Sequence, residues 1–133
     1  MRNTIVYVKG IIKKENKYLV LKKWMDDRIP DPFVWEFIDG EVSFGEAPDD
    51  CVLRLIRDRL GVDGTIERVV YTWSMMLGDT HGIGIAYVCN TDSDESQFVL
   101  TEEYGGFDWI ERDQFEYYIE NRYVLKDLEG VEL

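Results

Sequence analysis

The sequence is short of cysteine, histidine and basic residues. Only two of its 133 residues are cysteines, Cys51 and Cys89, and one is a histidine, so neither a zinc site nor a disulfide framework is indicated. We expect both cysteines to be buried free thiols. The 15 lysines and arginines stand against 27 aspartates and glutamates, which gives a formal net charge of −12. This charge argues against broad contact with a nucleic-acid polymer or an anionic membrane.

Long hydrophobic runs are missing as well. No stretch approaches the length of a membrane-spanning helix, and residues 1–4 lead into a strand pattern without the features of a signal peptide. A cytoplasmic location is the expectation that fits these observations. The chain does have 45% hydrophobic and 14% aromatic residues. This composition and the length favour one domain, residues 1–133, with a core of its own.

The hydrophobic pattern changes along the chain from strand-like alternation to a helical repeat and back. Strands are predicted over residues 4–12, 17–22, 33–37, 66–76, 82–90 and 107–110. The clearest helix runs from Pro48 to Leu60, with acidic residues in its first turn and Gly61 placed for a left-handed cap. A second helix is expected to begin near Arg112, and a glycine-punctuated turn is expected over 39–45. This mixture indicates an α+β fold.

One segment carries glycine, glutamate and arginine at a distinctive spacing. Five residues separate Gly40 from Glu46 and seven separate Glu46 from Arg54, after which come Ile56 and Gly61-Val62. This segment, 40–62, resembles the signature of the Nudix (MutT-like) hydrolases, whose box ends in Arg-Glu-apolar-any-Glu-Glu-any-Gly-apolar. The resemblance implies a Nudix α/β/α sandwich, with a mixed β-sheet between the box helix and a C-terminal helix.

Two further stretches resemble elements of the same family. Trp35-Glu36-Phe37 looks like the start of the lead-in Trp-x-Phe-Pro-Gly-Gly, with Ile38 and Asp39 in place of Pro-Gly. Later in the chain, Glu103 with Trp109 resembles a late Glu…Trp element. The resemblance therefore covers nearly the whole chain.

The metal-binding positions of the box depart from the family pattern. In the family, Mg²⁺ or Mn²⁺ is held by glutamates at the positions of Leu55, Asp58 and Arg59. A leucine cannot ligate a metal and an arginine brings a positive charge, so family-type metal binding is expected to be weakened or absent. The resemblance leaves a structural role to four residues, a brace between loop and helix and the glycines of the turns: Glu46, Arg54, Gly40 and Gly61.

These departures leave two hypotheses open. In the first, the chain is a divergent pyrophosphohydrolase acting on a nucleoside diphosphate derivative, with a metal site rebuilt from Asp58, Asp39 and Glu41. Glu36 or Glu103 would join that site or act as general base, with Asp58 and Glu103 as the catalytic acids. In the second, the chain is a catalytically inactive Nudix-fold module that binds a nucleotide-like ligand or regulates. Asp39 and Glu41 are also explained as solvated turn residues.

Three basic residues could bind phosphate where the metal cation is missing. Arg59 lies on the predicted helix, and Lys22 and Lys23 end the second predicted strand. If the three converge, they form an anion pocket within an otherwise repulsive field. Each also has an ordinary alternative as a solvated or ion-paired side chain.

His81 and several aromatic residues complete the candidates. His81 falls in a predicted turn over 78–82, where it would act as a loop-borne base or simply be solvated. Aromatic rings could stack on a nucleobase, although most must be core in a domain of this size. Tyr117, Tyr118 and Tyr123 could face a second copy in a homodimer, or the core.

Overall fold

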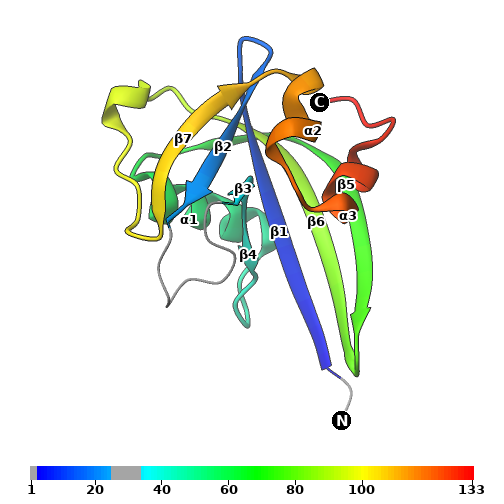
Figure 1. Cartoon of the computed structure of the whole chain (residues 1–133). Helices are drawn as coiled ribbons and strands as arrows, with labels where there is room; N and C mark the ends of the chain where they lie inside the picture. Colours follow the sequence, from blue (N-terminus) through cyan, green and yellow to red (C-terminus); the bar gives the residue numbers. More distant parts are fainter. Residues whose placement is uncertain (1–2, 25–33) are drawn as a thin grey trace.

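The computed structural model describes residues 3–24 and 34–133. Within these residues the chain forms the strands β1 (Asn3–Lys14), β2 (Lys17–Lys23), β3 (Trp35–Glu36), β4 (Ile38–Glu41), β5 (Thr65–Leu77), β6 (Thr80–Asn90) and β7 (Tyr104–Ile110) (Figure 1). The α-helices are α1 (Pro48–Leu60), α2 (Phe115–Tyr118) and α3 (Arg122–Leu128). Two short 3₁₀ turns, η1 (Glu95–Gln97) and η2 (Arg112–Gln114), precede β7 and α2.

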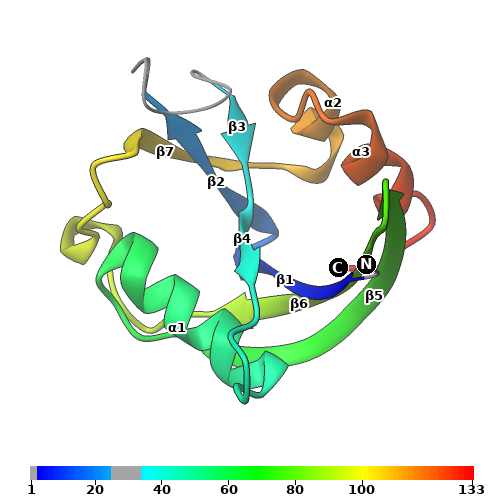
Figure 2. The same ribbon diagram turned by 90° about the horizontal axis from the view of Figure 1, so that it is seen from below.

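The strands form a mixed sheet in which β1 is central. β1 pairs in parallel with β6 and antiparallel with β4, and β5 pairs antiparallel with β6. A hairpin joins β1 to β2, which pairs with β3 and β7. Helix α1 and the α2–α3 pair lie on opposite sides of β4 (Figure 2). The predicted α+β fold, with a mixed sheet between the box helix and the C-terminal helical segment, is confirmed.

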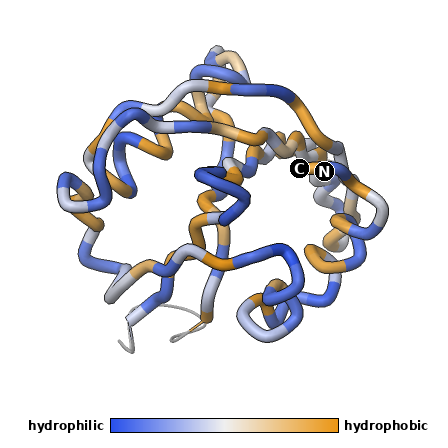
Figure 3. Tube along the Cα trace, turned by 90° about the horizontal axis from the view of Figure 1, so that it is seen from above, coloured by the Kyte–Doolittle hydropathy of each residue, from blue (hydrophilic) through white to orange (hydrophobic). Residues whose placement is uncertain are grey.

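Helix α1 begins and ends where the sequence predicts. Pro48 occupies the first turn, and Gly61 takes the left-handed conformation with φ of 69° and donates its N–H to the carbonyl of Arg57. Hydrophobic and hydrophilic stretches alternate along the trace (Figure 3). The apolar side of α1 packs on the sheet through the buried residues Cys51, Val52, Leu55, Ile56 and Leu60. Cys51 and Cys89 are free and buried, as predicted.

The turn predicted over 39–45 is wrong in its first part. Asp39 and Gly40 belong to β4, because they pair with Lys9 and Val8 of β1. Pairing with a neighbouring strand satisfies their backbone groups and overrides the turn preference of glycine and aspartate. The strand predicted over 33–37 is limited to Trp35–Glu36 in β3, and position 33 lies outside the described residues.

The turn predicted over 78–82 is also wrong in its extent. It contracts to Gly78 and Asp79, and β6 begins at Thr80. Thr80 and His81 pair with Leu77 and Met76 of β5, so His81 lies in a strand and not in a loop.

The single C-terminal helix predicted from Arg112 is a further error, because the structure has η2, α2 and α3 in its place. Ile119 leaves the helical conformation with ψ of 111°. The Asn121 side chain then accepts hydrogen bonds from the N–H groups of Tyr123 and Val124 and so caps the start of α3. The break lets Phe115 and Ile119 pack into the core beside β2.

Candidate functional site

A bidentate ion pair fixes the loop of the box segment to α1. Arg54 Nε donates to Glu46 Oε2 at 2.9 Å and Arg54 Nη2 donates to Glu46 Oε1 at 3.2 Å. The N–H of Ser43 donates to the same carboxylate at 3.1 Å. Arg54 Nη1 also lies 3.4 Å from Asp58 Oδ2. The predicted brace between Glu46 and Arg54 is therefore present, and Asp58 adjoins it on the exposed side of the helix.

The brace should make stability depend on acidity. The hydrogen bond from Arg54 lowers the pKa of Glu46 from 4.5 to about 2. Because the folded-state pKa lies below the unfolded one, the stabilisation is present above pH 4.5 and is lost as the pH falls towards 2. We expect Glu46→Gln to lower the free energy of unfolding at neutral pH, and the difference from wild type to shrink over that range. Urea unfolding at a series of pH values measures this difference.

The matched control for that series is Glu67→Gln, which removes one exposed carboxylate from β5. The control separates the effect of the brace from the general change in net charge. A difference between Glu46→Gln and wild type that stays constant across the acid range would contradict the assignment.

The first metal position of the box is part of the core. Leu55 is 3% exposed, and a Cβ built on Gly40 would lie 3.0 Å from both of its methyl carbons. The leucine therefore packs directly against Gly40 of β4, and the two residues form part of the contact between α1 and the sheet.

The three acids of the predicted metal site do not come together. β4 turns Ile38 and Gly40 towards α1, so by alternation Asp39 and Glu41 face the opposite side of the sheet from that helix. Asp58 lies on α1, half exposed and beside Arg54. Over residues 3–24 and 34–133, no three aspartates, glutamates, histidines or cysteines lie close enough to hold a metal ion. With Leu55 apolar and Arg59 cationic, the donor set does not fit the divalent ion that the family resemblance implies.

Arg59 and Lys23 come together around Tyr104, whose side chain contacts Arg59 and Glu36, and each of the two bases lies beside a glutamate. Arg59 Nε lies 3.3 Å from Glu103 Oε1, although without the alignment of a hydrogen bond, and Lys23 Nζ lies 3.4 Å from Glu36 Oε2. The Tyr104 hydroxyl donates to Glu36 Oε1 at 2.8 Å. We call these five residues the Arg59 cluster. Burial raises the pKa of Glu36, and Tyr104 and Lys23 oppose that shift.

Lys22, the third predicted phosphate ligand, points elsewhere. Its Nζ lies 5.6 Å from the centre of the Trp35 ring. The pairing of β2 with β7 is irregular between Lys22 and Lys23, and the two ammonium groups contact different residues, Trp35 and Glu36. Of the three predicted phosphate ligands, the fold therefore brings two, Arg59 and Lys23, close to each other.

A pocket of about 530 Å³ adjoins the Arg59 cluster. The strands contribute Lys9, Trp35, Glu36 and Asp39 to its lining, and the segment 119–124 closes it from the helical side. Two residues connect pocket and cluster: Glu36 contacts Lys23, and the backbone carbonyl of Asp39 accepts from Arg59 Nη2 at 3.3 Å.

Lys9 is the pocket residue that the sequence analysis missed. It lies in the middle of the apolar strand β1, between Val8 and Gly10, and only 4% of it is exposed. A single lysine within the hydrophobic run 5–12 was the available signal.

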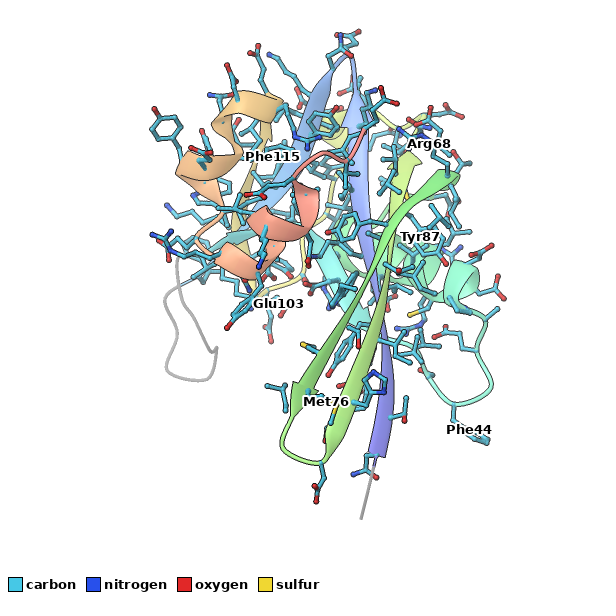
Figure 4. The ribbon with its side chains drawn as sticks, turned by 90° about the vertical axis from the view of Figure 1, so that its right-hand side faces the viewer. Phe44, Arg68, Met76, Tyr87, Glu103 and Phe115 are labelled. Carbon is cyan, nitrogen blue, oxygen red and sulfur yellow. The ribbon has the colours of Figure 1, made fainter. Side chains whose placement is uncertain are left out.

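Of the remaining candidates, Tyr123 lines the pocket, whereas His81, Tyr117 and Tyr118 do not. His81 Nε2 lies 2.9 Å from Ser74 Oγ on the β5–β6 hairpin, next to Met76 near its free end (Figure 4). Tyr117 and Tyr123 are more than four-fifths exposed, whereas the Tyr118 hydroxyl donates to Asp108 at 2.7 Å. A homodimer stays a prediction. None of the helices in the described part of the chain is long and apolar enough to cross a membrane.

Comparison with known proteins gives matches of structure only. No family profile and no curated sequence matches the chain. The fold matches the MutT protein of Methanosarcina mazei Go1 with a TM-score of 0.78 at 17% identity, over 96% of this chain and 92% of that one. It matches the MutT Nudix hydrolase of Burkholderia pseudomallei with 0.75 at 18% identity, over 96% and 99%.

A third solved structure, of a UDP-X diphosphatase, matches with a TM-score of 0.68 at 16% identity, over 85% of this chain and 53% of that one. Together with the strand order and the α1 brace, these likenesses show that the chain has the fold of the Nudix hydrolases.

Proposed function

We propose that this chain binds a nucleotide-like compound containing a diphosphate, with the ring of the ligand in the 530 Å³ pocket and its phosphates at Arg59. One observation carries the proposal. Arg59 stands where the family resemblance places a metal-binding glutamate, and it reaches the pocket wall through the carbonyl of Asp39. A guanidinium at this place can bind phosphate oxygens directly, through paired N–H donors.

The binding module is favoured over the hydrolase because of the donor set. The side chain of Leu55 is packed in the core, and the carboxylate of Asp58 is ion-paired with Arg54. No catalytic step is therefore assigned to a metal in this chain. The Glu46–Arg54 brace is intact, and we assign it a structural role, which is to hold the loop against α1, and no catalytic one.

A divergent Nudix-type pyrophosphohydrolase is the second candidate. It is supported by the likeness to hydrolases of the same fold, among them the UDP-X diphosphatase. Glu103, which faces Arg59, and Asp58 would be its catalytic carboxylates.

Calorimetric titration and phosphorus NMR separate the two candidates. ADP-ribose, UDP-glucose and inosine diphosphate are titrated into the protein in EDTA, and each mixture is then followed by NMR with Mg²⁺ or Mn²⁺. Saturable binding in EDTA without cleavage in either metal is the expected result. Cleavage that Asp58→Asn abolishes would overturn the binding module in favour of the hydrolase, and absence of binding in EDTA would overturn the proposal.

A further inference from the structure

Lys9 is a charged residue buried in the interior of this protein. Among the described residues it is the one charged residue that is buried, with 4% of its surface exposed, and it lines the pocket. In the sheet it lies between Asp39 of β4 and Ala86 of β6. Its place is therefore fixed by strand pairing on both sides.

The contacts of Lys9 are with an aromatic ring and with the charges of nearby acids. Its Nζ lies 4.8 Å from the centre of the Trp73 ring, a cation–π contact. That ring lies on Gly84, where an added Cβ would come within 2.0 Å of it. Burial lowers the pKa of Lys9, and Asp39, Asp127 and Glu36 oppose that shift.

A polar group without a partner lies in the same row of the sheet as Lys9. Tyr71 of β5 and Lys9 of β1 both pair with Ala86, from either side of β6. The Tyr71 hydroxyl is buried and has no hydrogen-bond partner in the described part of the chain. Burial raises the pKa of Tyr71, and the charges of Asp39 and Asp127 raise it further. The same two charges raise the pKa of Lys9, so the two groups share one environment.

Leaving a buried donor such as the Tyr71 hydroxyl unpaired is costly. Lys9 lines the pocket, so its ammonium has donors to offer to a ligand bound there. An ammonium group has three N–H donors and no acceptor, so it can bind an oxygen but not an amino group. The acids around Lys9 disfavour a further negative charge at this depth. The group that fits is consequently a neutral oxygen acceptor.

We infer that Lys9 determines ligand specificity by donating a hydrogen bond to a ring carbonyl of the ligand, so that the pocket selects oxo-bearing over amino-bearing rings. The Trp73 ring contacts the ammonium, and the Tyr71 hydroxyl lies in the same row of the sheet. This inference rests on the proposed function, because it assumes that the ring of the ligand enters this pocket.

The test uses matched ligand pairs that differ in one ring substituent. Calorimetry in EDTA compares inosine diphosphate with adenosine diphosphate, and uridine diphosphate with cytidine diphosphate. The wild type is expected to bind each oxo member at least about tenfold more tightly, as a hydrogen bond from a charged donor predicts. Lys9→Met keeps the length of the side chain and should bring both ratios close to one. The matched control Lys17→Met, on the exposed start of β2, should leave them unchanged.

The outcomes distinguish this inference from the function on which it rests. Equal binding of both members by the wild type overturns the role of Lys9 while the binding function stands. A preference that survives in Lys9→Met overturns it too, provided that the variant unfolds at no lower temperature than wild type. If no nucleotide binds to the wild type, the proposed function fails, and the inference fails with it.

Discussion

Replacing Leu55 with glutamate is expected to lower the free energy of unfolding by about 4 kcal/mol. The leucine is 3% exposed and lies against Gly40 in the wall between α1 and β4. Glutamate would remove its apolar contacts and place a carboxylate where the neighbours are apolar. Arg59, one turn further along α1, is already beside Glu103 and would have to leave that contact to pair with the new carboxylate.

Urea unfolding at neutral pH measures this loss, with Leu55→Met as the matched control. Methionine keeps the volume and polarity of the site, so it should cost less than about 1.5 kcal/mol. If Leu55→Glu is no less stable than Leu55→Met, the position is not closed by packing, and the argument against a metal there fails.

The double change Leu55→Glu with Arg59→Glu extends the same test. Together with Asp58 it places three carboxylates at positions i, i+3 and i+4, which share one face of a helix. We expect Mn²⁺ to raise the unfolding temperature of this variant and not that of the wild type, because binding to the folded state alone stabilises it. Saturable stabilisation of the wild type by Mn²⁺ would contradict the conclusion that its residues do not fit a divalent ion.

The features predicted correctly from the sequence depend on short stretches of chain. Helix α1 is predicted from Pro48 at its start and Gly61 after its end, and both act through their own backbone conformation. The Glu46–Arg54 brace is predicted by the family resemblance, and the two residues lie eight positions apart. Local signals of this kind need no knowledge of the tertiary structure.

The features that the sequence analysis missed depend on residues far apart in the chain. The pairing of β4 with β1 decides which face of the sheet Asp39 occupies, and a shift of one residue would reverse it. Arg59 meets Glu103 only because β7 comes to lie beside β2, near the end of α1. Tertiary pairing, and not residue type, sets these positions.

Glu103→Gln is expected to tighten the binding of a diphosphate ligand by about fivefold to tenfold, and Arg59→Gln to weaken it by at least about tenfold. The carboxylate of Glu103 lies 3.3 Å from Arg59 Nε and competes with the ligand for the guanidinium. Removing its charge while keeping its size frees Arg59 for phosphate. Part of the Coulomb energy is screened, because Glu103 is 37% exposed, and this limits the gain.

The double variant decides whether the two residues act through each other. If Glu103 acts only by occupying Arg59, then Glu103→Gln added to Arg59→Gln should recover little affinity, and the two effects will not add. Arg57→Gln is the matched control, since Arg57 lies on the same helix but pairs with Asp63 at 3.0 Å. It should leave the affinity measured by calorimetry within about twofold of wild type. Equal weakening by Arg57→Gln and Arg59→Gln would mean that the helix attracts the ligand through its general charge, and Arg59 would then lose its assignment as the phosphate-binding residue.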